Sequence, residues 1–237
     1  MERKYLAFDI ETAKLLPEGV TELLAHRPLG IACAAAFASD KQEAITWHGR
    51  LADGSPAPQL SRDEAHGLVN DLVELVRDGY TLVTWNGLSF DFNVLAEEAD
   101  AREECAELAM NHIDMMFHVV CDRGHYLGLQ KAALGMNLPG KLSDVSGAEA
   151  PKMWSEGKHD EILAYCTQDV RVTANLAATC DAERKLCWTT QRGKVTSMPL
   201  PKGWLPVTEA RDLPEPDTSW MSKPPVRADF FSWMSGE

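Results

Sequence analysis

The pattern of apolar and polar positions predicts four strands in the first third of the chain. Residues 4–12 are an apolar run that ends in charged positions, and residues 29–39 are a second apolar run. The many alanines of the second run leave a helix as its alternative. Residues 43–48 form the next predicted strand, joined to the second by a hairpin turn at Ser39-Asp40-Lys41. Residues 80–85, rich in β-branched and aromatic side chains, predict the fourth strand.

Apolar side chains at helical spacing predict the helices. The segment 61–78 begins with Ser61 and has Glu64 three residues later, a pair that caps helix N-termini, and Gly79 follows its end. Four further helical segments are predicted, at residues 90–112, 113–120, 127–134 and 159–184.

The order of these elements predicts an α/β fold. Three antiparallel strands come first, and at least one strand is added after a crossover helix. We expect the connections at residues 13–28 and 138–157 to be mostly irregular, the first of them loosely helical at most.

The C-terminal part of the chain has a different character. Residues 186–190 and 195–198 predict a hairpin, and seven of the 13 prolines lie between Pro199 and Pro225. Such a stretch is unsuited to regular helix or interior strand. It nevertheless holds many aromatic side chains, which disordered segments lack. We therefore predict a domain over residues 1–184, and a hairpin with a proline-rich arm over 185–237 that packs on the domain, on a second subunit or on another partner.

The composition is that of a globular protein, with 45% hydrophobic and 25% charged residues. No apolar run has the length of a membrane span, so no membrane partner is expected. The sequence Met1-Glu2-Arg3-Lys4 leads directly into the first strand without room for a signal peptide, which predicts a cytoplasmic location. The six cysteines lack metal-binding spacing and are interpreted as reduced, packed thiols.

The net charge of −13 argues at first against a nucleic-acid partner. The charge is unevenly distributed, however, because the stretch from Arg184 to Lys202 contains basic residues and no acid. Within it, Arg184, Lys185, Arg192 and Lys194 lie on the predicted hairpin, the last two in its turn, and Trp188 lies nearby, a combination suited to phosphates and stacked bases. The alternative is a solvated hairpin with a packed tryptophan.

The candidate chemistry begins at the end of the first strand. Asp9 and Glu11 are two residues apart and therefore point to the same face, opposite to Phe8 and Ile10. Two like charges beside a buried strand are unfavourable unless a divalent cation neutralises them. The alternative is that the two acids merely end an edge strand at the surface.

Three other acids stand in unusual contexts. Asp91 follows the fourth strand, where it is either a ligand or the N-cap of the next helix. Asp169 lies in a largely apolar helix, one turn after Tyr165, and needs either a metal or a salt-bridge partner. Asp114 is interpreted as a helix cap. Asp9, Glu11, Asp91 and Asp169 together form a set that suits two Mg²⁺ or Mn²⁺ ions, as used in phosphodiester hydrolysis, and the Tyr165 hydroxyl could orient the attacking water.

Three motifs in this order resemble those of the DEDD superfamily of 3′–5′ exonucleases. They are Asp9-Ile10-Glu11-Thr12, Asn86-x-x-x-Phe90-Asp91 and Tyr165-x-x-x-Asp169. The third has the tyrosine (DEDDy) form, because Ala164 stands where the histidine form has its histidine. Over residues 4–180 the chain is similar in particular to the proofreading exonuclease domain of family B DNA polymerases, including the segment from Tyr126 to Lys141.

The resemblance implies a ribonuclease H-like fold, with a mixed β-sheet flanked by helices. It also implies that Asp9 bridges both metals, that Glu11 and Asp169 complete one metal site, and that Asp91 serves the other. Tyr165 would position the nucleophile. Asn86 and Phe90 would lie near the substrate strand and Thr12 near its 3′ end, although Phe90 also fits a core position.

We therefore expect a two-metal 3′–5′ exonuclease that acts on the 3′ ends of single-stranded or frayed nucleic acid, with DNA favoured over RNA. One alternative is a ribonuclease or a degrader of short oligonucleotides. An alternative from a different class is a non-catalytic binding or adaptor module with an RNase H-like fold. The proline-rich arm suggests a homo-oligomer or a protein partner.

Overall fold

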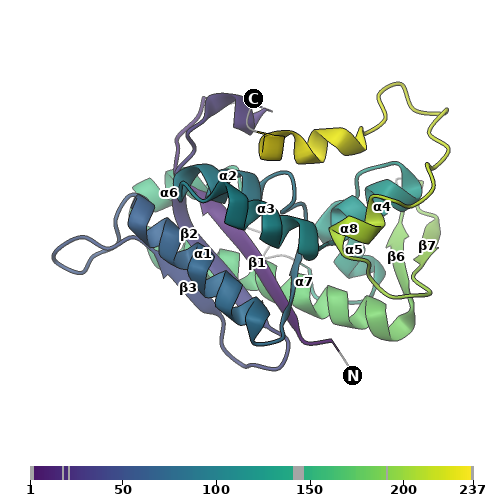
Figure 1. The fold of residues 1–237 in the computed structure, drawn as a ribbon, viewed down its shortest axis with the longest axis horizontal. Helices are drawn as coiled ribbons and strands as arrows, with labels where there is room; N and C mark the ends of the chain where they lie inside the picture. The colour runs from purple at the N-terminus through teal and green to yellow at the C-terminus, as the bar shows by residue number, and fades with distance from the viewer. Residues whose placement is uncertain (1–2, 18, 21, 141–146, 191, 236–237) are drawn as a thin grey trace.

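A computed structural model describes residues 3–17, 19–20, 22–140, 147–190 and 192–235 of the chain. Its centre is a mixed sheet of five strands in the order β3-β2-β1-β4-β5 (Figure 1). The strands are β1 Tyr5–Thr12, β2 Ile31–Ala38, β3 Ile45–His48, β4 Thr81–Thr84 and β5 Ile113–Asp114. β1 is antiparallel to β2 and parallel to β4. The predicted antiparallel start and the strand added after a crossover helix are both confirmed.

Helices cover both faces of this sheet (Figure 1). Phe8 and Ile10 of β1 pack in a core cluster with α1 Arg62–Arg77, α2 Asp91–Glu98 and α3 Arg102–Asn111. Tyr5 and Ala7 pack on the other face with α7 His159–Glu183. Because strand side chains alternate, Asp9 and Glu11 lie on the α7 face.

Helix α1 begins as its sequence predicts. The Ser61 side chain accepts a hydrogen bond from the backbone N–H of Glu64, and the Glu64 side chain accepts one from the backbone N–H of Ser61. This capping box satisfies two N–H groups that have no partner within the helix. Gly79 follows with φ +93°, a conformation that glycine adopts without strain.

The region after β4 differs from the prediction. The single helix expected over 90–112 is two helices, because the chain turns at Asp100, whose φ is +53°. The expected helix over 113–120 begins two residues late, since Ile113 and Asp114 pair with β4 as β5. A strand of two residues is too short to produce a periodic pattern in the sequence, so it is recognised only from its pairing with a neighbouring strand. Helix α4 Met115–Arg123 follows directly.

Among its described residues, the predicted loop at 138–157 contains one short helix, α6 Ala150–Ser155, which has a proline in its first turn, where proline is tolerated. Residues 141–146, including the Lys141 of the family resemblance, lie outside the described residues. α5 Leu129–Gly135 forms close to its predicted bounds, and the only helical turn described within 13–28 is η1 Leu23–His26.

The predicted hairpin is confirmed as β6 Lys185–Thr189 and β7 Val195–Pro199, which form a separate two-stranded sheet. The arm that follows contains two short helices, α8 Val207–Ala210 and η2 Arg227–Ser235. Our expectation that this stretch holds no regular helix was therefore wrong. Helix α8 fits between Pro206 and Pro214, whereas η2 begins after Pro225, beyond the last proline of the chain.

The arm packs on the rest of the same chain. The side chains of Trp204, Phe230 and Trp233 are buried. Trp233 Nε1 donates a hydrogen bond of 2.7 Å to the carbonyl of Leu88. The rings of Phe117 and Phe230 lie 5.0 Å apart. Burial of these aromatic side chains contributes substantially to the stability of the fold.

All six cysteines are free, as predicted, and five of them are buried. Among the helices that the structure describes, none has the length and apolar character needed to cross a bilayer.

Candidate active site

The carboxylates of Asp9 and Glu11 lie together at the end of β1. One ligand atom from each of Asp9, Glu11 and Cys166 lies within 4.8 Å of the other two. Glu11 is 5% exposed and Asp9 is half-buried. Two carboxylates this close and this dry repel each other unless a proton or a cation compensates their charge.

Helix α7 brings the third motif to the same place. Cys166 Sγ donates a hydrogen bond of 3.7 Å to the backbone carbonyl of Asp9. Tyr165 and Asp169 are each only 3% exposed, and their neighbours Cys166 and Val170 pack in the cluster between α7 and the sheet. Residues 166 and 169 are three apart and therefore share a helix face. The packing of α7 thus directs Asp169 toward the strand that carries Asp9 and Glu11.

Asp91 is connected to the strand through a hydrogen bond. Its Oδ1 accepts from the backbone N–H of Ile10 at 3.0 Å, and its side chain also interacts with that of Asp9. Burial raises the pKa of Asp91 to about 7, even though the hydrogen bond from Ile10 favours its charged form. The N-cap of α2 is Phe90, not Asp91, so the capping interpretation of Asp91 was wrong.

Asp114 holds the loop that carries the second motif. It accepts hydrogen bonds from the backbone N–H groups of Asn86 at 3.0 Å, Leu88 at 2.9 Å and Phe117 at 3.0 Å. The bond to Phe117 is the predicted helix cap. The other two fix the turn between β4 and Asp91. This function was missed, because from the sequence a cap and a loop anchor look alike.

The same turn has a strict local geometry. Asn86 has φ +78°, and a Cβ on Gly87 would lie 2.5 Å from Thr84 Oγ1. The N–H of Gly87 donates to Thr84 Oγ1. The hydroxyl of Thr84 is 2.9 Å from His112 Nε2, and His112 Nδ1 is 2.6 Å from the carbonyl of Ala109. The carbonyl requires a proton on Nδ1, so Nε2 accepts from Thr84, and burial lowers the pKa of His112 to about 4.

The predicted substrate-binding residues fall into two groups. Thr12 and Asn86 are half-buried near the carboxylates, and the Asn86 side chain accepts a hydrogen bond from Ser89 Oγ. Phe90 is half-buried against the main core, which favours the core interpretation of this residue. Arg192 and Lys194 are exposed on the β6–β7 hairpin and line a separate cavity. Gln191, in the same turn, lies outside the described residues.

Sequence reasoning missed two close neighbours of the acids. Cys166 was treated only as a packed thiol, although its position beside Tyr165 in the third motif could have suggested its place. Gly147 also comes close, because a Cβ at that position would lie 3.7 Å from Glu11 Oε2. Nothing in the sequence indicates this long-range approach.

The arrangement fits divalent cations. Its oxygen donors are carboxylates, which Mg²⁺ and Mn²⁺ prefer, and a cation would favour the charged form of Asp91, whose pKa is raised chiefly by burial. Asp9, Glu11, Asp91 and Asp169 are the residues that would hold such ions.

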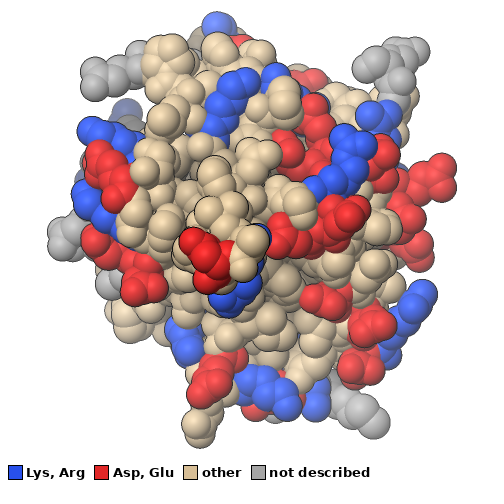
Figure 2. Space-filling view, turned by 90° about the vertical axis from the view of Figure 1, so that its left-hand side faces the viewer, with Lys and Arg blue, Asp and Glu red and all other residues tan. Residues whose placement is uncertain are grey.

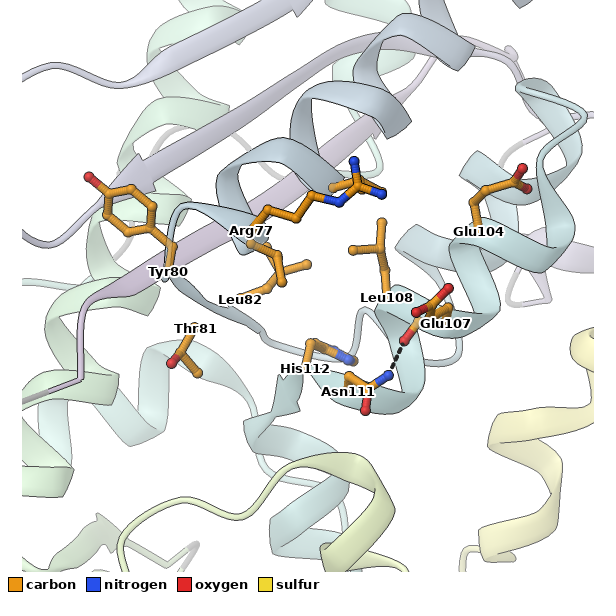
Figure 3. Close-up of a pocket in the computed structure, with 11 residues that line it drawn as sticks. Arg77, Tyr80, Thr81, Leu82, Glu104, Glu107, Leu108, Asn111 and His112 are labelled. Atoms are coloured by element: carbon orange, nitrogen blue, oxygen red, sulfur yellow. Dashed lines mark hydrogen bonds between the residues drawn. The ribbon is translucent and has the colours of Figure 1, made fainter.

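The surroundings separate this site from other cavities. A pocket of 340 Å³ between α1, α3 and the start of β4 is lined by Arg77, Leu82 and Leu108 (Figure 3). Leu82 pairs with Leu6 at the beginning of β1, whereas Asp9 and Glu11 stand near its end. This pocket therefore lies at the other end of the strand.

Acidic and basic side chains are interspersed over the face shown in Figure 2.

Comparison with known proteins agrees with this architecture. No curated protein sequence matches the chain. Solved structures that match include the family B DNA polymerase from the hyperthermophilic archaeon Pyrobaculum calidifontis, with a TM-score of 0.54 and 18% sequence identity. The match covers 76% of this chain and 25% of that polymerase, so the chain spans about a quarter of its length. At this identity the likeness shows a shared fold.

A family model gives the more direct assignment. The model of the RNase H superfamily matches residues 6–180, which include all of β1 but its first residue, the loop before α2 and most of α7. This range contains all four carboxylates, and it covers well over half of the chain. The chain belongs to the RNase H superfamily.

Proposed function

We propose that this protein is a metal-dependent 3′–5′ exonuclease that removes nucleotides from single-stranded or frayed 3′ ends, with DNA favoured. The superfamily and the fold support a nuclease-type domain. The observation that carries the finer proposal is the convergence of three separate motifs on the end of β1. Asp9 and Glu11 lie within 4.8 Å of Cys166 on α7, and Asp91 accepts the N–H of the residue between them.

The residues of the chain have distinct parts in this proposal. Asp9 has a ligand atom within 4.8 Å of one on Glu11, and its side chain interacts with that of Asp91, so it is the carboxylate best placed to bind two ions. Asp169 faces the same strand from α7. Bound divalent cations would supply Lewis acidity and lower the pKa of an attacking water. Tyr165, one turn before Asp169, would orient that water through its hydroxyl, and the turn at Asn86 would position the substrate strand.

The experiment is a digestion of 5′-labelled DNA and RNA oligonucleotides of identical sequence with Mg²⁺ or Mn²⁺. We expect a ladder shortened one nucleotide at a time from the 3′ end, faster on DNA. EDTA and the Asp9→Ala substitution should each reduce cleavage by at least about 10³-fold, since both remove charge stabilisation from the transition state. The exposed Asp53→Ala variant is the matched control and should cleave at the wild-type rate.

Robust cleavage by Asp9→Ala protein would refute the proposal. Faster digestion of RNA, or activity restricted to oligonucleotides of a few residues, would assign a different substrate to the same site. Absence of turnover on every substrate, with intact folding and metal present, would favour a binding module over an enzyme.

A further inference from the structure

A second cavity lies between residues 125–131, the β6–β7 hairpin and the C-terminal arm. Its volume is 560 Å³. We call it the hairpin pocket and define it by His125, Tyr126, Lys131, Arg192, Lys194 and Trp220, all of which line it. We propose that the hairpin pocket binds a base and the neighbouring phosphates of single-stranded nucleic acid, several nucleotides from the end that is cleaved.

The pocket exposes two large aromatic side chains. Trp220 is 66% exposed and Tyr126 is 59% exposed, which is unusual for rings of this size in a folded protein. A nucleobase stacks on such rings whatever its sequence, because every base has a flat π-face. The two rings therefore match a nucleic-acid strand better than an aliphatic ligand.

Both rings are held in place before a ligand arrives. Trp220 Nε1 donates to the carbonyl of Asp217 at 3.1 Å. The ring of Tyr126 stacks on Phe230, with the centroids 6.1 Å apart and the planes 28° from parallel. His125 packs edge-on between Trp188 at 5.9 Å and Trp220 at 6.4 Å. Fixed rings lose little conformational freedom when a base stacks on them.

The segment that carries Trp220 is itself anchored. It passes so close to Gly124 that a Cβ there would lie 2.3 Å from Thr218 Cγ2. Arg227 joins two parts of the arm to α4, because its guanidinium donates hydrogen bonds to backbone carbonyls in both. The acceptors are the carbonyls of Cys121 in α4 and of Arg211, Leu213 and Pro214 in the arm. The arm thus forms a fixed wall of the pocket.

The charge of the pocket identifies its ligand as an anion. Lys131, Arg192 and Lys194 line it, and no aspartate or glutamate does so among the residues that the structure describes. The chain as a whole has a net charge of −13, so a purely basic lining is a local exception. Stacking rings together with several cations match the bases and phosphates of a single strand.

A short structural link joins the pocket to the carboxylates. Trp85 Nε1 donates a hydrogen bond of 3.0 Å to the carbonyl of Leu127, the residue next to Tyr126. Trp85 also directly precedes Asn86, which begins the turn leading to Asp91. A strand that leaves the turn along this link would reach the pocket. The claim that the bound base lies upstream of the cleaved 3′ end rests on the proposed function. The claim that the pocket binds single-stranded nucleic acid does not.

The test measures binding without cleavage. Fluorescein-labelled ten-nucleotide oligothymidylate is titrated with full-length protein in EDTA, and fluorescence anisotropy gives the Kd. We expect Trp220→Ala and Tyr126→Ala each to raise the Kd about tenfold, the usual effect of losing one base–aromatic stack. Tyr80→Ala is the matched control, because Tyr80 is a half-buried tyrosine at the far end of the sheet, and it should leave the Kd unchanged.

The basic residues are tested through salt. Lys194→Gln should weaken binding and reduce the slope of log Kd against log salt by about 0.7, the value for one phosphate contact on a single strand. Arg62→Gln removes an exposed charge on α1 and should leave the slope unchanged. Lys194 is exposed on the hairpin, so its variant also serves if a tryptophan variant misfolds.

Oligonucleotides with one abasic position locate the stacked base. In wild-type protein, removing the base at one particular position upstream of the 3′ end should raise the Kd as much as the Trp220→Ala substitution does. In Trp220→Ala protein, removing the same base should not raise the Kd any further. Equal costs at that position in both proteins would overturn the assignment of the ring to a base.

The outcomes separate the two proposals. A Kd unchanged by Trp220→Ala, Tyr126→Ala and Lys194→Gln overturns the pocket even if the protein cleaves DNA. Tight binding that depends on these residues supports the pocket even if no cleavage is observed. A change in oligomeric state caused by Trp220→Ala, measured by light scattering, with unchanged oligonucleotide affinity would show that a second copy covers the pocket instead.

Discussion

At the scale of single residues, the candidate site brings together acids whose charges repel one another unless a proton or a cation compensates them. Asp91 accepts the N–H of Ile10, the residue between Asp9 and Glu11, and its side chain also interacts with that of Asp9. Burial raises the pKa of Asp91 to about 7 because water no longer solvates its charge. Such a group tolerates burial when a proton or a cation accompanies it. A perturbed carboxyl beside two other acids is typical of a functional site, which supports the proposed metal-binding role of this strand end.

Tyr165 tests whether a hydroxyl contributes to catalysis. Tyr165→Phe keeps the buried ring and removes only the hydroxyl, so we expect the cleavage rate to fall about 10²-fold. Metal binding, measured by calorimetry with Mn²⁺, should stay close to that of the wild type. Tyr80→Phe also removes a tyrosine hydroxyl, but far from the acids, and should cleave normally. Wild-type cleavage by Tyr165→Phe would exclude this residue from the mechanism.

Asp114 tests the anchoring of the second motif. Asp114→Asn leaves one acceptor oxygen and directs an NH₂ group at backbone N–H donors that the carboxylate now satisfies. We expect the free energy of unfolding to fall by about 2–3 kcal/mol in urea titrations, because at least one buried donor loses its partner. Asp53→Asn, at an exposed site, should change it by less than about 0.5 kcal/mol. Equal losses in both variants would contradict the anchoring role.

At the scale of elements, strand β1 and helix α7 together carry most of the site. The period of two in β1 sends Phe8 and Ile10 to the α1 face and leaves Asp9 and Glu11 facing α7. Helix α7 packs on that face with Cys166 against the Asp9 carbonyl. The two elements are 147 or more residues apart in sequence between Thr12 and His159, so only the fold joins them.

Two glycines test how closely the elements pack. In Gly135→Ala the new Cβ would lie 2.1 Å from the carbonyl oxygen of Cys187, so α5 and β6 must move apart. We expect the free energy of unfolding to fall by about 1–3 kcal/mol. In Gly67→Ala the Cβ meets nothing within 4 Å inside α1, and helix propensity should raise stability by about 0.5–1 kcal/mol. Thermal melts of both variants check the opposite signs. A melting temperature that shifts in the same direction in both variants would show that close contact with β6 does not determine the effect of the substitution at position 135.

At the scale of the whole molecule, the C-terminal arm completes both cores. Trp233 and Phe230 belong to the cluster on the α1 face, and Trp204 belongs to the cluster on the α7 face. His118 of α4 lies against Trp204 with ring centroids 5.4 Å apart. Its Nδ1 accepts the N–H of Leu205 at 3.3 Å. The arm therefore contributes to the stability of the domain on which it packs.

His118 gives this contact a pH dependence. Burial lowers its pKa from 6.5 to about 4, so the folded protein keeps it neutral at a pH where the unfolded chain binds a proton. Its contribution to stability is complete above pH 6.5 and is lost as the pH falls toward 4, by up to about 3 kcal/mol. His118→Asn keeps an acceptor for Leu205 and removes the titration. The free energy of unfolding in urea should therefore fall less steeply between pH 7 and pH 4 for this variant than for the wild type. An equally steep fall in both proteins would contradict the assignment of this pH dependence to His118.

Much of the fold could be predicted because its signals are local. Alternation placed β1, the Ser61 and Glu64 pair placed the start of α1, and helical spacing placed α7. The break between α2 and α3 was missed because it depends on one residue, Asp100, with a left-handed backbone. β5 was missed because its two residues form a strand only through pairing with β4. The short helices of the arm were missed because the many prolines indicated an extended segment, and the short proline-free intervals in which the helices form were not considered separately.

The sequence by itself determined which side chains could carry the chemistry, namely two acids at a strand end, an acid after a strand, and a tyrosine and an acid one turn apart. Such patterns are local, since side-chain direction follows from φ and ψ alone. Only the tertiary structure decided that Asp91 bonds to Ile10 and that Cys166 joins Asp9 and Glu11. It also placed Trp220 and Tyr126 in the lining of the same cavity, the hairpin pocket. Those contacts connect distant parts of the chain, and they depend on how the two cores pack, which no single segment specifies.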